Sequence, residues 1–351
     1  MELGCRAAEP GEFTKRAFLS GKIDLTAAEG IKELVEAASH HQWQAARQLA
    51  TGTLKGAIDD LREKLIKAMA YLEAMIDFPD EGDTQSVHLG QVEVLTKAVD
   101  QQIRVLVGTY NSGKIARNGL GVALIGMPNA GKSTLMNKLL DRDRAIVTDI
   151  AGTTRDYIEE PCLINGRLIR LIDTAGIRDT DNPVERIGVE EAHRFAREAD
   201  LVIALCPSDA EPDQVAFVQE TLVKACGNKL MSVVTKSDLG SSPWEQDFDM
   251  SISCHADNGI DNLKSCLAQK VDNFTKPLAE NLVISSVRQK QGLEEALGFL
   301  DNFFGQLASG GYEECLAFEL QQAAESLGTV IGEVSNDEIL GKIFSDFCVG
   351  K

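Results

Sequence analysis

The chain has 351 residues, and its 35 lysines and arginines against 54 aspartates and glutamates give a formal net charge of −19. So acidic a chain is a poor non-specific binder of nucleic acid, because that affinity comes from lysine and arginine neutralising phosphates; any RNA contact needs a local basic patch or a partner that supplies the charge. No apolar stretch approaches the ~18 residues of a membrane span, and the N-terminal region lacks a secretory signal. The 8 cysteines form no C-x-x-C pair, which favours reduced thiols over disulfides or a zinc site. We therefore expect a cytoplasmic protein with no membrane contact.

Residues 24–116 are predicted to form the first part of an all-α domain. Between 54 and 75, apolar residues alternate spacings of four and three, a repeat that is typical of antiparallel helix packing or a coiled-coil seam. These residues are Leu54, Ile58, Leu61, Leu65, Ala68, Leu72 and Met75. Pro79 should end this helix, a second helical pattern runs from Leu89 to Leu106, and glycine and asparagine near 108–119 predict a loop.

Residues 117–276 change to an α/β pattern. Short apolar runs predict buried strands at 120–125, 168–172, 201–205 and 230–234. Helical patterns lie between them, near 133–140, 185–198, 213–226 and 259–273. Such alternation predicts a mostly parallel sheet with helices on both faces.

Residues 277–351 are predicted to be helical again. One apolar stripe runs from Leu293 to Leu307, another from Leu320 to Ile331, and Ser335-x-x-Glu338 has the pattern of a capping box that opens a last helix. The expected fold is therefore an α/β domain inserted into one all-α helical domain. Two separate helical domains on either side of the α/β unit are the alternative.

The segment Gly126-Met-Pro-Asn-Ala-Gly-Lys132-Ser133 fits the phosphate-loop pattern G-x-x-x-x-G-K-[ST] between a predicted strand and a predicted helix. In this context backbone N–H groups point at phosphates, Lys132 reaches the β and γ oxygens, and the Ser133 hydroxyl ligates Mg²⁺. The alternative is a chance match in a glycine-rich turn. The predicted contacts to the nucleotide come from Asn129, Ala130, Gly131, Lys132, Ser133 and Thr134.

Three further segments follow in the order and spacing of a GTP site, although each tetrad alone is a weak signal. Asp173, Thr174, Ala175 and Gly176 follow a predicted strand, so that Asp173 can hold Mg²⁺ through water and the Gly176 N–H can sense the γ phosphate. Thr235, Lys236, Ser237 and Asp238 follow another strand. The Asp238 carboxylate can accept hydrogen bonds from guanine N1–H and N2–H, which adenine does not offer, so GTP is the predicted ligand. Ser253, Cys254 and His255 are predicted to back the base.

The predicted switch segment lies between the phosphate loop and Asp173. It comprises Thr148, Asp149, Ile150, Ala151, Gly152, Thr153 and Thr154. One of its threonine hydroxyls should complete the magnesium shell, and a solvated threonine-rich loop is the alternative. The residue after Gly176 is Ile177, where many regulatory GTPases carry a glutamine that orients water, so hydrolysis needs another device.

Taken with both ends of the chain, these motifs resemble the MnmE (TrmE) family over essentially the whole length. The resemblance rests on Pro10-Gly-Glu-Phe-Thr-Lys-Arg-Ala-Phe-Leu19, Gly21-Lys-Ile-Asp-Leu25, the phosphate loop, 148–156 and Phe347-Cys-Val-Gly-Lys351. It implies a GTPase that, with the FAD-containing partner MnmG, installs a carboxymethylaminomethyl-type modification on the wobble uridine of tRNA.

The resemblance also implies a device that replaces the missing glutamine. A potassium ion takes the place of an arginine finger, held by Asn129, Thr148, Ile150 and Thr153, and transient pairing of two GTPase domains completes its site. Ser133 and Thr154 hold Mg²⁺. Glu185 matches a water-orienting glutamate and acts with Lys132 and Asp173 in catalysis; from the residues alone, Glu185 is a helix N-terminal acid favoured by the macrodipole.

At the two ends, the resemblance assigns Cys348 to the modification function and Lys22 and Lys351 to contacts with a folate one-carbon donor. From the residues alone, these are an inert thiol and two surface lysines. Family members begin with a folate-binding domain that forms a constitutive dimer, and residues 1–23 correspond to its end, which leaves folate binding and that dimer open for this chain. Thr235 departs from the usual asparagine of N-K-x-D, but Asp238 remains.

Two other functions stay open from the sequence. One is a ribosome-assembly switch similar to Era or Der, which would need an appended RNA-binding module; no G-x-x-G loop in a basic context follows the α/β region. The other is a truncated GTPase without modification activity.

Overall fold

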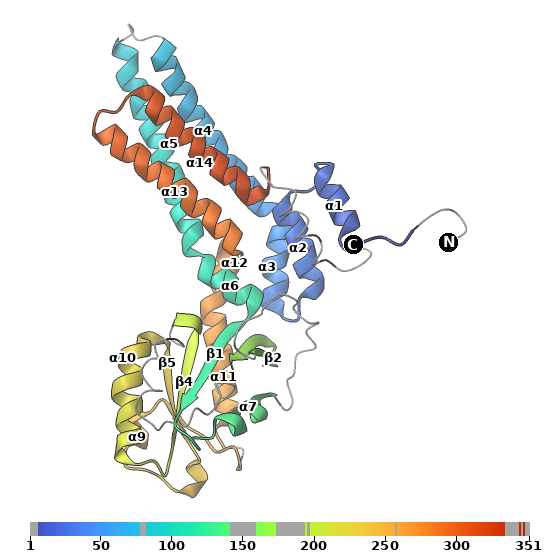
Figure 1. The fold of residues 1–351 in the computed structure, drawn as a ribbon, viewed down its shortest axis with the longest axis vertical. Coiled ribbons are helices and arrows are strands. Elements are labelled where there is room, and N and C mark those ends of the chain that lie inside the picture. The colour runs from blue at the N-terminus through green and yellow to red at the C-terminus, as the bar shows by residue number, and fades with distance from the viewer. Residues whose placement is uncertain are drawn as a thin grey trace, which may run out of the picture. The chain divides into compact units, whose positions relative to one another are not determined.

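The computed structural model of the chain describes residues 6–77, 82–140, 159–172, 194, 197–256, 258–333, 344 and 347. The chain divides into two compact units (Figure 1). The helical unit comprises 1–37, 41–117 and 275–351, and the nucleotide unit comprises 38–40 and 118–274. Because segments from both sides of the nucleotide unit build one helical unit, the predicted insertion is confirmed and the alternative of two helical domains is wrong.

The helical unit is built from nine described helices. They are α1 (Glu12–Leu19), α2 (Leu25–Glu36), α3 (His40–Ala50), α4 (Thr53–Asp77), α5 (Gly82–Gly108), α6 (Tyr110–Asn118), α12 (Pro277–Glu280), α13 (Val287–Ala308) and α14 (Glu313–Ile331). Asp24 caps α2, since its carboxylate accepts hydrogen bonds from the N–H groups of Thr26 at 2.8 Å and Ala27 at 3.1 Å. Within the described residues, no helix is long and apolar enough to cross a membrane.

The core of the helical unit lies between the long helices α4, α5, α13 and α14, which run side by side in Figure 1. All seven residues of the predicted repeat in α4 are buried in it. Facing them from α13 are Leu293, Leu297 and Leu300, which belong to the predicted stripe, and the fully buried Phe303; the neighbouring Phe304 is partly buried against the same core.

The predicted loop near 108–119 is wrong, because α6 occupies 110–118. Glycine normally weakens a helix, but Gly113 lies against the backbone of Ile284, where an added Cβ would sit 2.2 Å from the Ile284 carbonyl oxygen. Ile115 and Ala116 on the same helix are buried. Close packing against residues far along the chain therefore forms a helix that local propensity does not favour.

The nucleotide unit is a six-stranded sheet in the order β2-β3-β1-β4-β5-β6. Its strands are β1 (Leu120–Gly126), β2 (Glu159–Ile164), β3 (Arg167–Ile172), β4 (Leu201–Pro207), β5 (Leu230–Thr235) and β6 (Met250–Ser251). Neighbouring strands are parallel except β2 and β3, which form a hairpin. The mostly parallel class is confirmed, and β2 and the two-residue β6 were missed by the sequence analysis. Asn165-Gly166, both with positive φ (50° and 74°), were the available hairpin signal.

The described helices of the nucleotide unit are α7 (Lys132–Leu140), α9 (Pro212–Ala216), α10 (Val223–Cys226) and α11 (Ile260–Thr275). The predicted helix at 213–226 contains a π-helical segment, Phe217–Leu222, between α9 and α10. Strand β4 is buried along its whole length, as expected for a central parallel strand covered on both faces.

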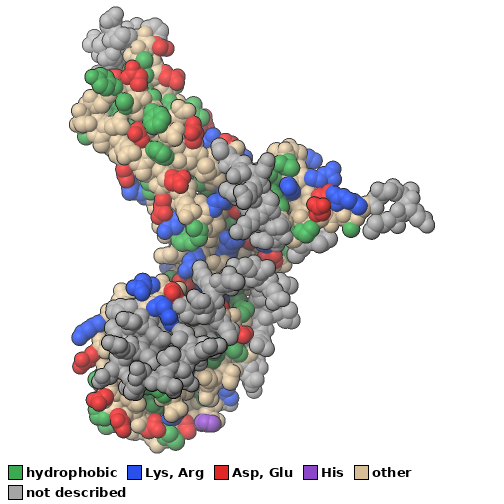
Figure 2. Space-filling model, viewed as in Figure 1, with side chains coloured by type: hydrophobic (Ala, Val, Ile, Leu, Met, Phe, Trp, Pro, Cys, Tyr) green, Lys and Arg blue, Asp and Glu red, His purple; other side chains and the backbone are tan. Residues whose placement is uncertain are grey.

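Charge is unevenly spread over the surface. On the face shown in Figure 2, acidic side chains are scattered over the helical unit, whereas the group over α1 is mainly basic, with the exposed Lys15 and Arg16 beside the Arg6–Glu12 ion pair. A local basic patch of this kind is what a strongly acidic chain needs for any contact with RNA.

Candidate functional site

The phosphate loop connects the end of β1 to the start of α7 and is shaped by two glycines. Gly126 passes the neighbouring strand so closely that an added Cβ would lie 2.7 Å from the Leu205 carbonyl oxygen. Gly131 has a φ of 91°, in the left-handed region that favours glycine, and Asn129 also lies there with a φ of 64°. The two glycines of this loop therefore follow from its backbone path.

Lys132 stands at the first turn of α7 and folds back over the loop. Its Nζ donates to the carbonyl oxygens of Gly126 at 2.6 Å and Met127 at 3.0 Å. The ammonium group is thereby held over the loop that the sequence assigns to phosphate binding, while Ser133 and Thr134 are exposed at the N-terminal end of the helix. Such an end, with its unpaired N–H groups and positive dipole, favours an anion.

Thr235, the last residue of β5, ties the predicted base-binding loop to the phosphate loop. Its Oγ1 donates a hydrogen bond of 2.7 Å to the Ala130 carbonyl oxygen, and the side chain is 2% exposed. The next residue, Lys236, has a φ of 57°, and its carbonyl oxygen accepts a hydrogen bond of 2.8 Å from Ser208 Oγ. Thr235, which replaces the usual asparagine of N-K-x-D, thus holds the base-binding loop against the phosphate loop.

Asp238 is exposed and held in place from behind by Ser253. Ser253 Oγ donates to Asp238 Oδ1 and accepts a hydrogen bond of 3.1 Å from the Ala256 N–H, and the Ser253 side chain is fully buried. The hydrogen bond from Ser253 is the main cause that lowers the pKa of Asp238 below its usual value, with backbone hydrogen bonding and the nearby charges of His255 and Lys236 adding to it. The carboxylate is therefore ionised, so both of its oxygens are acceptors and neither is a donor.

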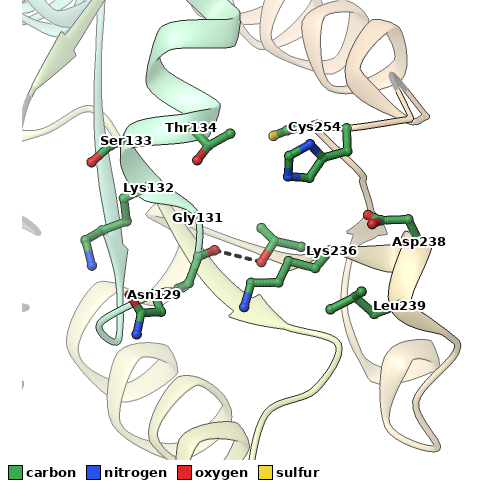
Figure 3. Close-up of a pocket in the computed structure, with 12 residues that line it drawn as sticks. Asn129, Gly131, Lys132, Ser133, Thr134, Lys236, Asp238, Leu239 and Cys254 are labelled. Carbon is green, nitrogen blue, oxygen red and sulfur yellow. Dashed lines mark hydrogen bonds between the residues drawn. The ribbon is translucent and has the colours of Figure 1, made fainter.

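The phosphate loop and the loop that carries Asp238 border a cavity of about 560 Å³ (Figure 3). It is lined by Asn129, Ala130, Gly131, Lys132, Ser133, Thr134, Thr235, Lys236, Asp238, Leu239, Cys254 and His255. In Figure 3, Asn129 and Lys132 lie on the phosphate-loop side, and Asp238 and Leu239 lie on the opposite side. The size is that of a typical small-molecule site.

Most of the predicted nucleotide contacts that the structure describes line this cavity, with two exceptions. Ser253 lies behind Asp238, and Ser237 lies outside the lining. Leu239, 63% exposed, was missed by the sequence analysis; its position directly after Asp238 was the available signal.

Several predicted residues lie outside the described part of the chain. They are Thr148, Asp149, Ile150, Ala151, Gly152, Thr153, Thr154, Asp173, Thr174, Ala175, Gly176, Glu185, Cys348 and Lys351, and the predicted capping box at 335–338 lies there as well. Lys22 is described and lines a different cavity of about 480 Å³ in the helical unit, beside Asp24, Lys55 and Glu333.

Within the described residues, no three His, Cys, Asp or Glu side chains form a cluster that could hold a metal. The donor set at the cavity instead fits a metal that shares its shell with phosphate, because the exposed Ser133 hydroxyl and the Asn129 amide offer neutral oxygens next to Lys132.

Comparisons with known proteins identify the family of the chain. Among solved structures, the chain is similar to the G domain of the T. maritima FeoB iron transporter at 21% identity over 43% of this chain and 97% of that chain, with a TM-score of 0.32. Residues 25–348 match the family described as the MnmE helical domain. The tRNA modification GTPase MnmE of Chlorobium chlorochromatii (strain CaD3) is 37% identical over 100% of this chain and 77% of the relative. That of Aquifex aeolicus (strain VF5) is 39% identical over 99% and 78%. The chain therefore belongs to the MnmE family.

Proposed function

We propose that the chain binds and hydrolyses GTP and that this reaction serves the modification of tRNA. The observation that carries the proposal is the joining of the phosphate loop and the Asp238 loop around one cavity, in a chain of the MnmE family. The function in tRNA modification rests on the family relatives. For domain boundaries we propose 117–276 for the GTPase domain and 24–116 with 277–351 for the helical domain.

Guanine is selected by Asp238. Its ionised carboxylate accepts from N1–H and N2–H of the base, and Ser253 keeps it in one orientation. Lys236 and Leu239 lie on the same side of the cavity and offer apolar surface to the faces of the base. Cys254 and His255 approach the base edge from the next loop.

The triphosphate lies over the phosphate loop. Lys132 exchanges its two carbonyl partners for β and γ phosphate oxygens, and the N–H groups at the start of α7 bind the same anion. Ser133 and Thr154 would hold Mg²⁺, with Asp173 acting through water and Gly176 sensing the γ phosphate. Magnesium in that place would offset the negative charge of the phosphates.

Ile177 cannot orient water, so hydrolysis depends on other residues. Asn129, exposed at the rim of the cavity, would hold K⁺ together with Thr148, Ile150 and Thr153, and Glu185 would orient the attacking water. Potassium there would offset the charge that builds up on the β–γ bridge in the transition state. Transient pairing of two GTPase domains completes this arrangement.

The modified base is the wobble uridine of tRNA, and the FAD-containing partner is MnmG. Cys348 belongs to the modification chemistry, while Lys22 and Lys351 are the proposed folate contacts. The gathering of basic side chains over α1 supports an RNA contact on the helical unit, in a chain that is otherwise too acidic for one.

The proposal is tested by steady-state GTP hydrolysis in matched KCl and NaCl, with Asn129→Ala beside the wild type. We expect KCl to stimulate hydrolysis strongly and Asn129→Ala to abolish the stimulation while binding of fluorescently labelled GDP persists. Equal rates in the two salts would contradict the potassium mechanism, and no GTP turnover in either salt would contradict the proposed hydrolase.

A further inference from the structure

Helix α3 lines a third cavity, of about 350 Å³, which shares no described lining residue with the nucleotide cavity. Its lining consists of Trp43, Gln44, Arg47, Gln48, Thr51, Thr53 and Leu278. None of these is acidic, although the chain carries 54 aspartates and glutamates. Arg47 is therefore the only charged residue among the described residues of the lining and has no carboxylate beside it there, and the volume is that of a small-ligand site.

The aromatic wall of this cavity is Trp43. Its side chain is 43% exposed, and the guanidinium carbon of Arg47, one helical turn later, lies 5.4 Å from the centre of its ring. A guanidinium at this distance is attracted to the ring electrons and keeps the ring in place. The pair combines a flat apolar face with a fixed positive charge.

The polar wall is Gln48, whose amide is held by the start of the C-terminal helical segment. Its Nε2 donates to the carbonyl oxygens of Leu278 at 3.1 Å and Asn281 at 3.3 Å. Its Oε1 is buried and accepts no hydrogen bond from any described residue. A buried acceptor without a donor costs free energy, so the oxygen is suited to an N–H from a ligand.

We propose that this cavity binds one unpaired nucleotide of an RNA, with the base stacked on Trp43, its N–H donating to Gln48 Oε1 and the adjoining phosphate paired with Arg47. Stacking on an aromatic ring beside an arginine is how proteins hold splayed-out bases of RNA loops. The inference rests on the proposed function, which makes tRNA the partner. A fully paired duplex would not fit, because its bases are stacked on one another and offer no free face.

The chain has two tryptophans, so the stacking is measurable directly. Trp244→Phe, in the nucleotide unit, leaves Trp43 as the single tryptophan. We expect an RNA hairpin with an unpaired loop to quench its fluorescence on titration, and a blunt duplex of the same length to leave it unchanged. Equal quenching by both RNAs, or by neither, would overturn the proposal.

Substitutions separate stacking from charge. Trp43→Leu should weaken hairpin binding roughly 5- to 150-fold, while Trp43→Phe keeps most of the affinity. Arg47→Gln should lower the slope of log affinity against log salt by about 0.7, the value for one phosphate contact on a single strand. Phe318→Ala removes another exposed aromatic, 56% exposed on α14, and should change nothing.

Binding of labelled GDP, measured on every variant, distinguishes failure of the proposed RNA site from failure of the proposed GTPase function. If GDP binds normally and Trp43→Leu leaves hairpin affinity unchanged, the nucleotide-binding cavity on α3 is refuted while the GTPase stands. If the wild type binds hairpin RNA but not GDP, the proposed function fails and the RNA site stands by itself.

Discussion

The hydrogen bond from Thr235 to the phosphate loop predicts how a single hydroxyl group affects GDP affinity and stability. Thr235→Val keeps the shape of the side chain and removes its hydroxyl, so that the Ala130 carbonyl oxygen loses a buried donor at 2.7 Å. The change leaves Lys132, Ser133 and Asp238 untouched. Thr235 lines the cavity but is only 2% exposed, so we expect the effect on the nucleotide to pass mainly through the backbone of the phosphate loop.

The size of the effect follows from burial. Leaving a buried acceptor unsatisfied costs roughly 1–3 kcal/mol. If the loop keeps its path, this cost lowers the free energy of unfolding of the nucleotide unit. If the loop instead shifts so that the carbonyl oxygen reaches water, it must move back when GDP binds. The affinity for GDP then falls roughly 5- to 150-fold, since 1.4 kcal/mol is about tenfold in affinity.

The assay is a titration with fluorescently labelled GDP, paired with urea unfolding of the same samples. Thr235→Ser keeps the hydroxyl and is the matched control, for which we expect affinity and stability near the wild type. Unchanged affinity together with unchanged stability in Thr235→Val would refute the role assigned to this hydrogen bond.

Two more predictions concern the helical unit. Gly113→Ala should lower the free energy of unfolding by about 1–3 kcal/mol or more, because its Cβ would lie 2.2 Å from the Ile284 carbonyl oxygen. Gly56→Ala, with open space around it on α4, is the control and should raise the free energy of unfolding by ~0.5–1 kcal/mol. Urea unfolding followed by circular dichroism measures both variants, and equal effects would contradict the close packing of Gly113. Burial raises the pKa of Glu33 from 4.5 to about 7 despite the Arg117 Nε at 2.9 Å, so the folded chain keeps a proton that the unfolded chain releases, and stability falls as pH rises through that window. Glu33→Gln should remove up to about 3 kcal/mol of this pH dependence between pH 5 and 7, and an unaltered pH profile would contradict it.

The sequence predicted those parts of the fold that depend on strong local signals. The repeat from Leu54 to Met75 identified a buried helix face, because a spacing of four and three puts every apolar residue on one side. The phosphate loop was identified because few residue types suit its backbone, as the left-handed φ of Gly131 shows.

The features that the sequence analysis missed depend on contacts between distant segments. Helix α6 forms because Gly113 packs on Ile284, and nothing near residue 113 signals that contact. The hydrogen bond from Thr235 to Ala130 joins positions 105 apart in the chain and has no local pattern. Strand β2, in contrast, had a local signal in Asn165-Gly166, which is typical of an antiparallel hairpin and not of parallel strands.

The central claim, a site for guanine nucleotides, is tested most directly by base selectivity in the wild type and in Asp238→Asn. A carboxylate at this position accepts from N1–H and N2–H of guanine, whereas an amide can donate to the 2-oxo group of xanthine. We predict that competition against labelled GDP ranks GDP far above ADP and XDP in the wild type. In Asp238→Asn, GDP should lose roughly 10²-fold or more, from charge-assisted hydrogen bonds of ~1.5–3 kcal/mol each, and XDP should gain. Equal binding of ADP and GDP by the wild type, or unchanged selectivity in Asp238→Asn, would contradict the account.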